Sequence, residues 1–578
     1  MRLLVLYGSQ TGTAQDVAEQ IWRESRQWGC QGPVLSFEDY NIQQLIEERL
    51  VVFVVATTGD GVETDNMKQA WRFLLKRSLP SNSLQGLQFA CLGLGDSSYP
   101  KFNYAAKKLH KRLLNLGATS ITPLGLCDDQ HDYGHLGTSL SWTKELWQTL
   151  SGSLGLRQQE RSVEVNRWEL QVLENDELKV LEQRLLWTQK QPAHVLKLNK
   201  NIRTTAEEHF QDVRLLQLSF DKDVNWQPGE VLDVQPQNSK ERVEEFFNLF
   251  KEHHLGYNDS TLVKVKSAHE DLPLPEAYAS PLTLQQAATY VWDLSAKPRQ
   301  RFLEVLAKNC NDEMESEKLL ELCTAEGLDD LIAYINRPRR TLLELLQDFP
   351  HATSKLTLQQ LFEMMPLIQA RSFSIASCCS SGTLDLLVAV VNYKTIMQAP
   401  RLGLCSNWLK HLQHGTEVHG LIKPGTMSWP KNPETPLIMI GPGTGIAPFR
   451  SIIQERRQQR EAGEKIGPLV VFFGCRSRHK DYHFEQDFKA WQSERIIELN
   501  VAFSRDQDSK VYVQHLIQGQ ATRLAQLIKE QQAYVYVAGS SNDMPKAVRE
   551  AFIEALAGDA LYLEQMIKER RYQEETWA

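Results

Sequence analysis

The chain has 578 residues, which is too long for one hydrophobic core and predicts about three or four domains. Its net charge of -8 and its sequence pI near 6.1 disfavour binding to nucleic acid, and no block of like charge forms a polybasic tail. An acidic surface of this kind favours a basic protein partner.

Cysteine usage and apolar runs indicate the cellular setting. Nine cysteines occur without any C-x-x-C pair, and the adjacent Cys378 and Cys379 match neither a zinc nor an iron–sulfur pattern. We therefore expect reduced, structural thiols and no metal site. No run of eighteen apolar residues occurs, and the sequence starts directly on an apolar strand. We expect a cytoplasmic protein without a membrane anchor or signal peptide.

The first predicted strand, Leu3–Tyr7, is followed at once by a small, polar loop that opens a helix. Backbone N–H groups and the helix dipole make such a loop an anion site. A nucleotide triphosphate loop would end in Gly-Lys-Ser/Thr, which is missing here, so the loop suits one monoester phosphate without a metal. This favours a flavodoxin-like FMN domain over a plain strand-to-helix turn. The predicted phosphate-binding residues are Ser9, Gln10, Thr11, Gly12, Thr13 and Ala14.

Short apolar runs alternate with helical patterns from residue 1 to about 150. Val51–Ala56 and Phe89–Gly93 are predicted strands, and Lys101–Leu116 is a predicted helix. The alternation predicts a doubly wound parallel sheet covered on both faces. Residues 151–190 are polar without a convincing core pattern, so we interpret them as a linker.

Two more loops follow strand ends of this first sheet, the edge at which a doubly wound sheet binds its ligand. Glycines let the backbone approach a flat ring, and Tyr99 can stack on the ring face. Each loop alone is more often an ordinary turn, but three in the right order favour a flavin site. The predicted residues are Ala56, Thr57, Thr58, Gly59, Leu94, Gly95, Asp96, Ser97, Ser98, Tyr99, Pro100, Lys101, Phe102, Asn103 and, closing the site beside Asp128, Asp129.

From about residue 191 to 430 the pattern predicts a β-barrel interrupted by a helical insert at about 240–365. In the strand Arg371–Ser377, alternation lets Arg371 bind a pyrophosphate, Phe373 lie under a ring and Ser374 hydrogen-bond it. Gly403 opens a helix whose amides can bind the same pyrophosphate. The alternative is an exposed strand followed by an ordinary helix cap. The predicted FAD-binding residues are Arg371, Ser372, Phe373, Ser374, Gly403, Leu404, Cys405 and Ser406.

Residues 431–578 again alternate strands with helices, which predicts a second doubly wound, Rossmann-like sheet. The loop Gly441–Pro448 is glycine-rich but departs from the G-x-G-x-x-G spacing. Arg505, Lys510 and Tyr512 can together bind a 2′-phosphate and an adenine, which favours NADPH over NADH. A solvated Arg and Lys on a loop is the alternative. The predicted nucleotide-binding residues are Thr444, Ser504, Arg505, Lys510, Val511, Tyr512, Val513 and Gln514.

Taken together, these motifs resemble the NADPH-dependent diflavin reductases over nearly the whole chain. The resemblance rests on Ser9–Ala14, Gly93–Asn103, Arg371–Ser374, Gly441–Arg450, Phe503–Gln514 and the terminal Arg571–Ala578. It implies an α/β multidomain protein with a flavodoxin-like FMN domain, an FAD barrel with a helical insert and an NADPH domain. The implied cofactors are FMN, FAD and NADPH.

The same resemblance implies roles for individual residues near the carboxyl terminus. In the family, the near-terminal aromatic residue covers the flavin and moves aside for nicotinamide, and Trp577 matches it. Ser374 and Glu575 are then the remaining members of a proton relay. Arg339 and Asp543 are carried over as further cofactor-binding residues.

Four positions differ from the microsomal members of the family. Thr58 stands in place of a ring-stacking tyrosine, and Phe373 in place of a tyrosine at the FAD. Ala538 and Ser540 stand where those members carry a cysteine and an acidic residue.

The implied function is electron transfer from NADPH to FAD, then to FMN, and finally to a one-electron protein acceptor, with domain motion about the 151–190 linker. Without an anchor or a haem domain, the chain is similar to members that reduce an anamorsin-type iron–sulfur protein in cytosolic iron–sulfur assembly. The alternatives are a reductase for haem proteins or methionine synthase, and a flavin-binding regulatory scaffold.

Overall fold

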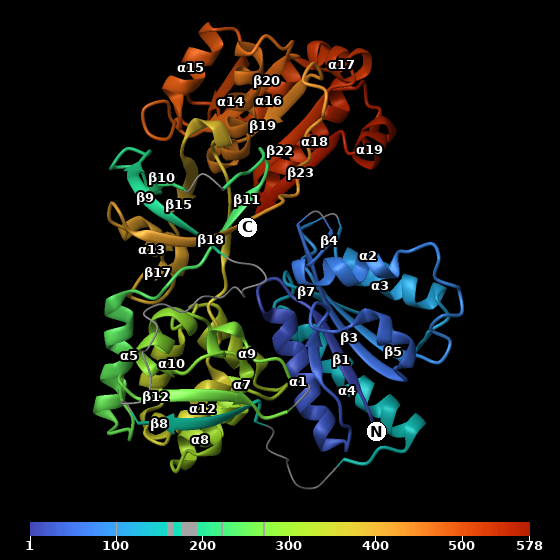
Figure 1. Ribbon diagram of the computed structural model, residues 1–578, viewed down its shortest axis with the longest axis vertical. Helices are drawn as coiled ribbons and strands as arrows, with labels where there is room; N and C mark the ends of the chain where they lie inside the picture. Colours follow the sequence, from blue (N-terminus) through green and yellow to red (C-terminus); the bar gives the residue numbers. More distant parts are fainter. Residues whose placement is uncertain are drawn as a thin grey trace. The chain divides into compact units, whose positions relative to one another are not determined.

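The computed structural model describes residues 1–59, 61–99, 101–158, 166–174, 193–220, 224–269 and 272–577 (Figure 1). The chain divides into two compact units, which are described separately. Unit 1 contains Met1–Leu186, Asn238–Ile368 and Thr395–Met397. Unit 2 contains Trp187–Gln237, Gln369–Lys394 and Gln398–Ala578.

The amino-terminal sheet of unit 1 has the order β2-β1-β3-β5-β6, with β7 paired to β5 and the short β4 paired antiparallel to β3. All its other pairs are parallel. The strands are β1 (Leu4–Gly8), β2 (Val34–Ser36), β3 (Leu50–Thr58), β4 (Val62–Glu63), β5 (Gln88–Gly95), β6 (Thr119–Ser120) and β7 (Gly125–Asp128).

Helices cover both faces of this sheet because alternate residues of each strand face opposite sides. Leu3 and Val5 pack towards α1 and α4, whereas Leu4 and Leu6 pack towards α2 and α3. The four helices are α1 (Thr13–Gln27), α2 (Lys68–Leu74), α3 (Tyr104–Asn115) and α4 (Leu136–Leu154). The predicted doubly wound, flavodoxin-like sheet is therefore confirmed.

The helical part of unit 1 also contains a three-stranded antiparallel sheet of β8 (Trp168–Leu173), β12 (Leu262–Ser267) and β13 (Leu282–Thr283). β8 lies within the stretch predicted as a linker, and β12 and β13 lie within the stretch predicted as helical. Their pairing partners are distant in sequence, which local patterns do not show. The helices are α5 (Lys240–Glu252), α6 (Leu284–Gln286), α7 (Gln300–Lys308), α8 (Glu313–Glu321), α9 (Leu328–Leu331), α10 (Leu342–Asp348), α11 (Pro350–Thr353) and α12 (Leu358–Met364).

The flavodoxin-like sheet and the helical insert share one hydrophobic core within unit 1. The Trp22 ring of α1 makes an edge contact with the His269 ring at 5.6 Å between centroids. Arg167 pairs with Glu19 of α1 at 2.7 Å and with Glu363 of α12 at 3.4 Å. These partly buried charges are paired on both sides, which offsets the cost of removing them from water.

Unit 2 contains a six-stranded antiparallel sheet with the order β14-β11-β18-β9-β10-β15. A bridge between Ile375 and Leu386 joins the two ends, so the sheet nearly closes into the predicted barrel. The strands of this sheet are β9 (His194–Arg203), β10 (Val213–Ser219), β11 (Val231–Val234), β14 (Arg371–Ser374), β15 (Leu384–Ala389) and β18 (Glu417–Lys423). Between β15 and β18 lie a separate hairpin of β16 (Asn392–Tyr393) and β17 (Arg401–Leu402), and the helix α13 (Leu404–His411).

The carboxyl-terminal sheet of unit 2 is parallel, with the order β21-β20-β19-β22-β23 and helices on both faces (Figure 1). Its strands are β19 (Leu437–Ile440), β20 (Leu469–Cys475), β21 (Glu498–Phe503), β22 (Tyr534–Ser540) and β23 (Tyr572–Trp577). Its helices are α14 (Ala447–Glu461), α15 (Glu485–Ser493), α16 (Val513–Gly519), α17 (Ala521–Glu530), α18 (Asp543–Ala555) and α19 (Ala560–Lys568). Across the described ranges, no helix is both long and apolar enough to cross a bilayer.

Candidate functional site

The loop after β1 in unit 1 forms a tight turn at the start of α1. Gly12 has a φ of 94°, which favours glycine, and its N–H donates to Ser9 Oγ at 3.1 Å. The side chain of Gln10 exchanges two hydrogen bonds with Asp65, at 3.0 and 3.1 Å. The six predicted phosphate-binding residues therefore lie in one turn, with helix N–H groups at its centre.

Asn103 links the loop after β5 to β7. Its side chain is completely buried and donates to the Cys127 carbonyl at 2.9 Å. A Cβ on Gly95 would lie 2.9 Å from the Asn103 nitrogen, so this position needs glycine. The Asn103 side chain thus holds the ends of β5 and β7 together through its Nδ2 group.

Acidic residues lie at the same edge of the sheet. Asp128 Oδ1 accepts from the Ser97 and Gln130 N–H groups at 2.9 and 3.0 Å. Burial alone would raise the pKa of Asp128, but these hydrogen bonds outweigh it and leave the pKa below its usual value. Tyr99, Lys101 and Phe102 are half-buried nearby in sequence. Pro100 lies outside the described residues.

In unit 2, β14 pairs with β11 so that Ser372 lies opposite Asp233 and hydrogen-bonds to its carboxylate. Arg371 is exposed, and its Nη1 donates to the carbonyls of Gln369 and Ala370 at 2.8 and 3.3 Å. Arg371 therefore has a defined direction and remains accessible, as a pyrophosphate-binding residue requires.

The start of α13 is fixed by contacts with Val391, which lies between β15 and β16. Ser406 Oγ accepts from the Val391 N–H at 3.0 Å, and a Cβ on Gly403 would lie 2.7 Å from the Val391 Cβ. Burial raises the pKa of the Cys405 thiol to about 12, with the Arg371 charge as a smaller opposing effect. The side chains of Cys405 and Ser406 therefore face the protein, and this segment offers backbone N–H groups.

Sequence reasoning missed one aromatic residue beside this helix. Tyr393 lies in β16, is 45% exposed, and pairs with Arg401 of β17, which leads directly to Gly403. An exposed ring next to a helix start is a candidate platform for the adenine of FAD.

Ser374 and Glu575, predicted from the resemblance, come together although 201 residues separate them. Ser374 Oγ lies 3.5 Å from Glu575 Oε1, and Thr426 Oγ1 donates to Glu575 Oε2 at 2.7 Å. Burial raises the pKa of Glu575, while the hydrogen bonds from Thr426 and Ser374 oppose the rise. Thr426 was missed because no motif surrounds it.

Trp577 lies at the end of β23, opposite Ser540, and is 37% exposed. Its carbonyl accepts from the Ser541 N–H at 2.9 Å. The backbone of Trp577 is thus fixed by the sheet, and its ring keeps an exposed surface.

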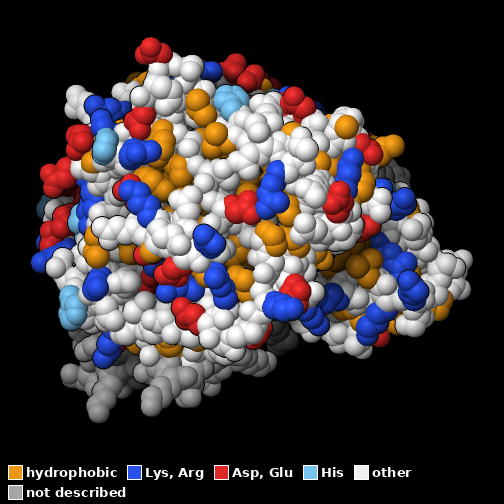
Figure 2. All heavy atoms as spheres, turned by 90° about the horizontal axis from the view of Figure 1, so that it is seen from above, with side chains coloured by type: hydrophobic (Ala, Val, Ile, Leu, Met, Phe, Trp, Pro, Cys, Tyr) orange, Lys and Arg blue, Asp and Glu red, His pale blue; other side chains and the backbone are white. Residues whose placement is uncertain are grey.

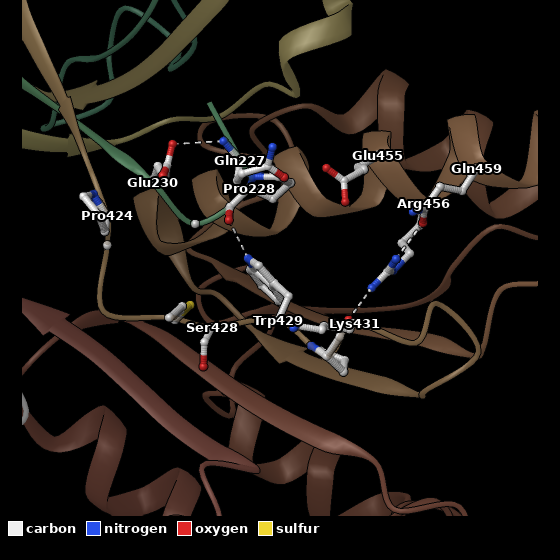
Figure 3. A pocket seen from close by; sticks show the side chains of 14 residues that line it. Gln227, Pro228, Glu230, Pro424, Ser428, Trp429, Lys431, Glu455, Arg456 and Gln459 are labelled. Carbon is white, nitrogen blue, oxygen red and sulfur yellow. Dashed lines mark hydrogen bonds between the residues drawn. The ribbon is translucent and has the colours of Figure 1, made fainter. Parts of the chain in front are cut away.

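A pocket of about 370 Å³ is lined in part by residues on both sides of Thr426, from Pro424 to Lys431 (Figure 3). Its lining includes Pro228, Trp429, Lys431, Glu455 and Arg456, and none of the predicted site residues. The Trp429 indole donates to the Pro228 carbonyl at 2.8 Å, and Ser428 N donates to Gln573 Oε1 at 2.9 Å. These two contacts join the segment after Thr426 to β23 and to the Pro228 turn, and so position Thr426 beside Glu575.

The glycine-rich loop after β19 lies close against β22. A Cβ on Gly445 would lie 2.0 Å from the Ala538 carbonyl oxygen, and Gly443 has a φ of 58°. Thr444 lies between them, and α14 starts at Ala447 with Pro448 in its first turn. The loop therefore brings backbone and a hydroxyl to the carboxyl edge of the sheet.

Arg476 follows β20, Arg505 lies just after β21, and Lys510 and Tyr512 lie in the loop that leads to α16. The Arg505 N–H donates to the Arg476 carbonyl at 2.8 Å. Hydrogen bonding to Arg505 lowers the pKa of Tyr512, and the charges of Lys510 and Arg476 add to this effect. Arg476 was missed, and its guanidinium lies 4.2 Å from the centre of the Phe210 ring. Arg476 directly follows β20 and lies three residues beyond Phe473, the last residue of the predicted strand, so this strand end was the signal that could have found it.

The remaining predicted residues have plainer positions. Ser504 is 8% exposed, and Val513 is 3% exposed in the core, so its side chain does not face a nucleotide. Asp543 is exposed at the first position of α18. Arg339, with a φ of 54°, belongs to unit 1, whereas Arg371 belongs to unit 2.

Three protein-family models match the chain. The flavodoxin model matches residues 5–142, the FAD binding domain model residues 188–408, and the oxidoreductase NAD-binding domain model residues 439–550. Proteins named NADPH-dependent diflavin oxidoreductase 1 are similar over the whole chain. Those of Xenopus laevis and Danio rerio are 41% and 42% identical over 608 and 602 residues, covering 100% of this chain and 99% of each relative. The Schizosaccharomyces pombe protein is 34% identical over 590 residues with the same coverage.

The chain belongs to the NADPH-dependent diflavin oxidoreductase 1 family.

As a member of the diflavin oxidoreductase family, the chain is an NADPH-dependent oxidoreductase with FMN, FAD and NADPH as cofactors, and it passes electrons to an acceptor protein. This confirms the predicted fold class, enzyme class and cofactors, and it favours an enzyme over a regulatory scaffold. When bound, two flavins convert a two-electron hydride donor into a source of single electrons.

Proposed function

We propose that this diflavin oxidoreductase reduces an anamorsin-type iron–sulfur protein in the cytoplasm, with the acceptor docking at the FMN edge of unit 1. The observation that carries the proposal is the acidic segment after β7. Asp129 and Asp132 are exposed there and Asp128 is half-buried. A carboxylate cluster beside the flavin edge attracts a basic segment of a partner and raises its rate of association.

The charge distribution elsewhere supports a localised docking surface. Figure 2 shows basic and acidic side chains interspersed over one face of the molecule, without a large area of one sign. All nine cysteines belong to the described residues and are free thiols. Free thiols fit a reducing compartment such as the cytoplasm.

Within the enzyme, the predicted residues have distinct roles. Arg505, Lys510 and Tyr512 bind the 2′-phosphate end of NADPH, and Arg371 with the start of α13 binds the FAD pyrophosphate. Thr426 and Ser374 orient the Glu575 carboxyl, whose raised pKa lets it hold a proton near the nicotinamide. Trp577 covers the flavin until nicotinamide displaces it.

The test is an acceptor screen with NADPH and the full chain. An anamorsin-type iron–sulfur protein, a haem protein and methionine synthase are compared by the absorbance change of each chromophore. We expect the iron–sulfur protein to be reduced fastest, with a rate that falls as added salt shortens the Debye length below about 10 Å. Faster reduction of either other acceptor contradicts the proposal.

A variant pair tests the docking surface separately from the acceptor's identity. Asp129→Asn combined with Asp132→Asn should slow reduction of the iron–sulfur protein several-fold and flatten its salt dependence. Asp259→Asn, an exposed aspartate of the insert, is the matched control. FMN content is measured in each preparation so that cofactor loss is not mistaken for weaker docking. Equal rates for the double variant and the control place docking elsewhere.

A further inference from the structure

Arg299 of the helical insert lies beside the phosphate loop of the flavodoxin-like sheet, within unit 1. It precedes α7, and its Nη1 is 3.2 Å from Asp16 Oδ1 in the first turn of α1. Its Nη2 would lie 3.1 Å from a Cβ placed on Gly12. The guanidinium therefore stands directly against the turn that holds the FMN phosphate.

The phosphate loop itself carries no positive side chain that could pair with a phosphate. Ser9–Ala14 contains hydroxyl, amide and methyl groups and no positive side chain. Asp16 adds a negative charge in the first turn, which repels a phosphate dianion bound at the same helix start. Arg299 offsets Asp16 and leaves its second nitrogen directed at Gly12.

Charges of the insert and of the flavodoxin-like sheet also act together on His135. Burial lowers the pKa of His135, and the charges of Asp16, Lys297, Asp129 and Arg299 all act on it. The acidic edge of the flavodoxin-like sheet and the cations of the insert therefore lie within electrostatic range of each other.

We propose that Arg299 is a binding residue for the FMN phosphate, supplied by the insert to a site whose other groups come from the flavodoxin-like sheet. FMN binding and the packing of this sheet against the insert are then linked, because each stabilises the other by the same free energy. A movement that separates them would weaken the hold on FMN. The proposal is independent of which protein accepts the electrons.

The test measures flavin affinity directly. Full-length protein is depleted of FMN, and binding of FMN and of riboflavin is followed by quenching of flavin fluorescence. Arg299→Gln should weaken FMN about tenfold at low salt, as expected for a partly exposed charge-assisted contact. Riboflavin affinity should not change, because riboflavin has no phosphate. Arg301→Gln is the matched control, since Arg301 pairs with Glu304 at 3.4 Å on the same helix.

Asp16→Asn separates phosphate binding from a simple ion pair between Arg299 and Asp16. If Arg299 binds the phosphate, Asp16→Asn removes a repulsive charge and tightens FMN binding or leaves it unchanged. If Arg299 only pairs with Asp16, both variants weaken FMN by similar factors. That result, an equal loss of riboflavin affinity, or an unchanged FMN affinity in Arg299→Gln would overturn the proposal.

Discussion

The chain contains two doubly wound sheets whose proposed phosphate sites are built differently. In unit 1, the loop Ser9–Thr13 offers only backbone and neutral side chains, and the cation beside Gly12, Arg299, comes from the helical insert. In unit 2, the cations Arg476, Arg505 and Lys510 come from loops of the same sheet. We therefore propose that FMN is held mainly by the backbone N–H groups of its loop, and that NADPH is held mainly by charged side chains.

This difference matches the use of the two cofactors. FMN stays bound through many turnovers, so a shaped cradle of N–H groups suits it. NADPH must enter and leave in each cycle and be distinguished from NADH by one phosphate. Charged side chains at a sheet edge provide that discrimination, since a charge-assisted contact forms only when the 2′-phosphate is present.

We expect the largest effect from Gly445→Ala, which tests whether NADPH-dependent activity also depends on the backbone shape of the loop after β19. Gly445→Ala places a Cβ where it would meet the Ala538 carbonyl oxygen at 2.0 Å, so the loop or β22 must shift. A displacement of this order costs about a hundredfold in rate. We expect that loss in NADPH-dependent ferricyanide reduction, with FMN content unchanged.

Gly519→Ala is the control for this variant, because nothing lies within 4 Å of its added Cβ. Full activity in Gly445→Ala would show that the loop adapts, and that the close approach to β22 is unnecessary.

Arg505→Ala tests the charge-based half of the comparison. Loss of a contact worth about 1.5–3 kcal/mol should raise the Kd for NADPH roughly ten- to a hundredfold. NADH affinity should hardly change, because NADH lacks the 2′-phosphate. Titration with NADP⁺ and NAD⁺ measures both.

Arg523→Ala is the control, since Arg523 is a surface residue paired with Glu498. An equal loss for both dinucleotides would mean that Arg505 supports the loop and does not distinguish the 2′-phosphate.

Trp577→Ala should have a smaller effect, because it removes one stacking contact without a charge. A stacked ring contributes about 0.5–1.5 kcal/mol beyond burial, which corresponds to roughly two- to twelvefold. Nicotinamide would no longer have to displace the indole, so use of NADH should improve relative to NADPH. Steady-state kinetics with both donors measure this ratio. An unchanged ratio would indicate that Trp577 serves only to pack the terminal strand.

The sequence predicted both doubly wound sheets well because their strands are buried on both faces and form continuous apolar runs. The strand–turn–helix form of the loops after β1 and β19 was also predictable, since each is a local segment. The short strands β8 and β12 were not predicted, because they are partly polar and their pairing joins residues about 90 positions apart.

The same dependence on contacts between distant segments limited the prediction of site residues. Thr426 and Arg299 contact Glu575 and Asp16, which are distant in sequence, so no local motif marks them, whereas Arg476 was marked only by its place after β20. Conversely, sequence patterns do not tell which way a loop side chain points. Asn103 and Ser406 were predicted at cofactor sites, yet their side chains bond to Cys127 and Val391 within the protein.

The smallest expected effect concerns Glu575, the carboxyl beside the predicted nicotinamide site. Because burial raises its pKa on folding, the folded chain binds this proton more tightly than the unfolded chain. Its contribution to the free energy of unfolding is therefore complete below the unfolded pKa and is lost as pH rises through the raised, folded pKa. Glu575→Gln stays neutral, so the melting temperature of the unmodified chain should fall relative to this variant as pH rises, by about one to three degrees.

Thermal unfolding from acidic to neutral pH measures the difference. Glu550 is an exposed glutamate of α18, so Glu550→Gln should show no such trend. A constant difference across pH would mean that Thr426 and Ser374 stabilise the charged carboxylate as well as burial disfavours it, and that Glu575 holds no proton near neutral pH.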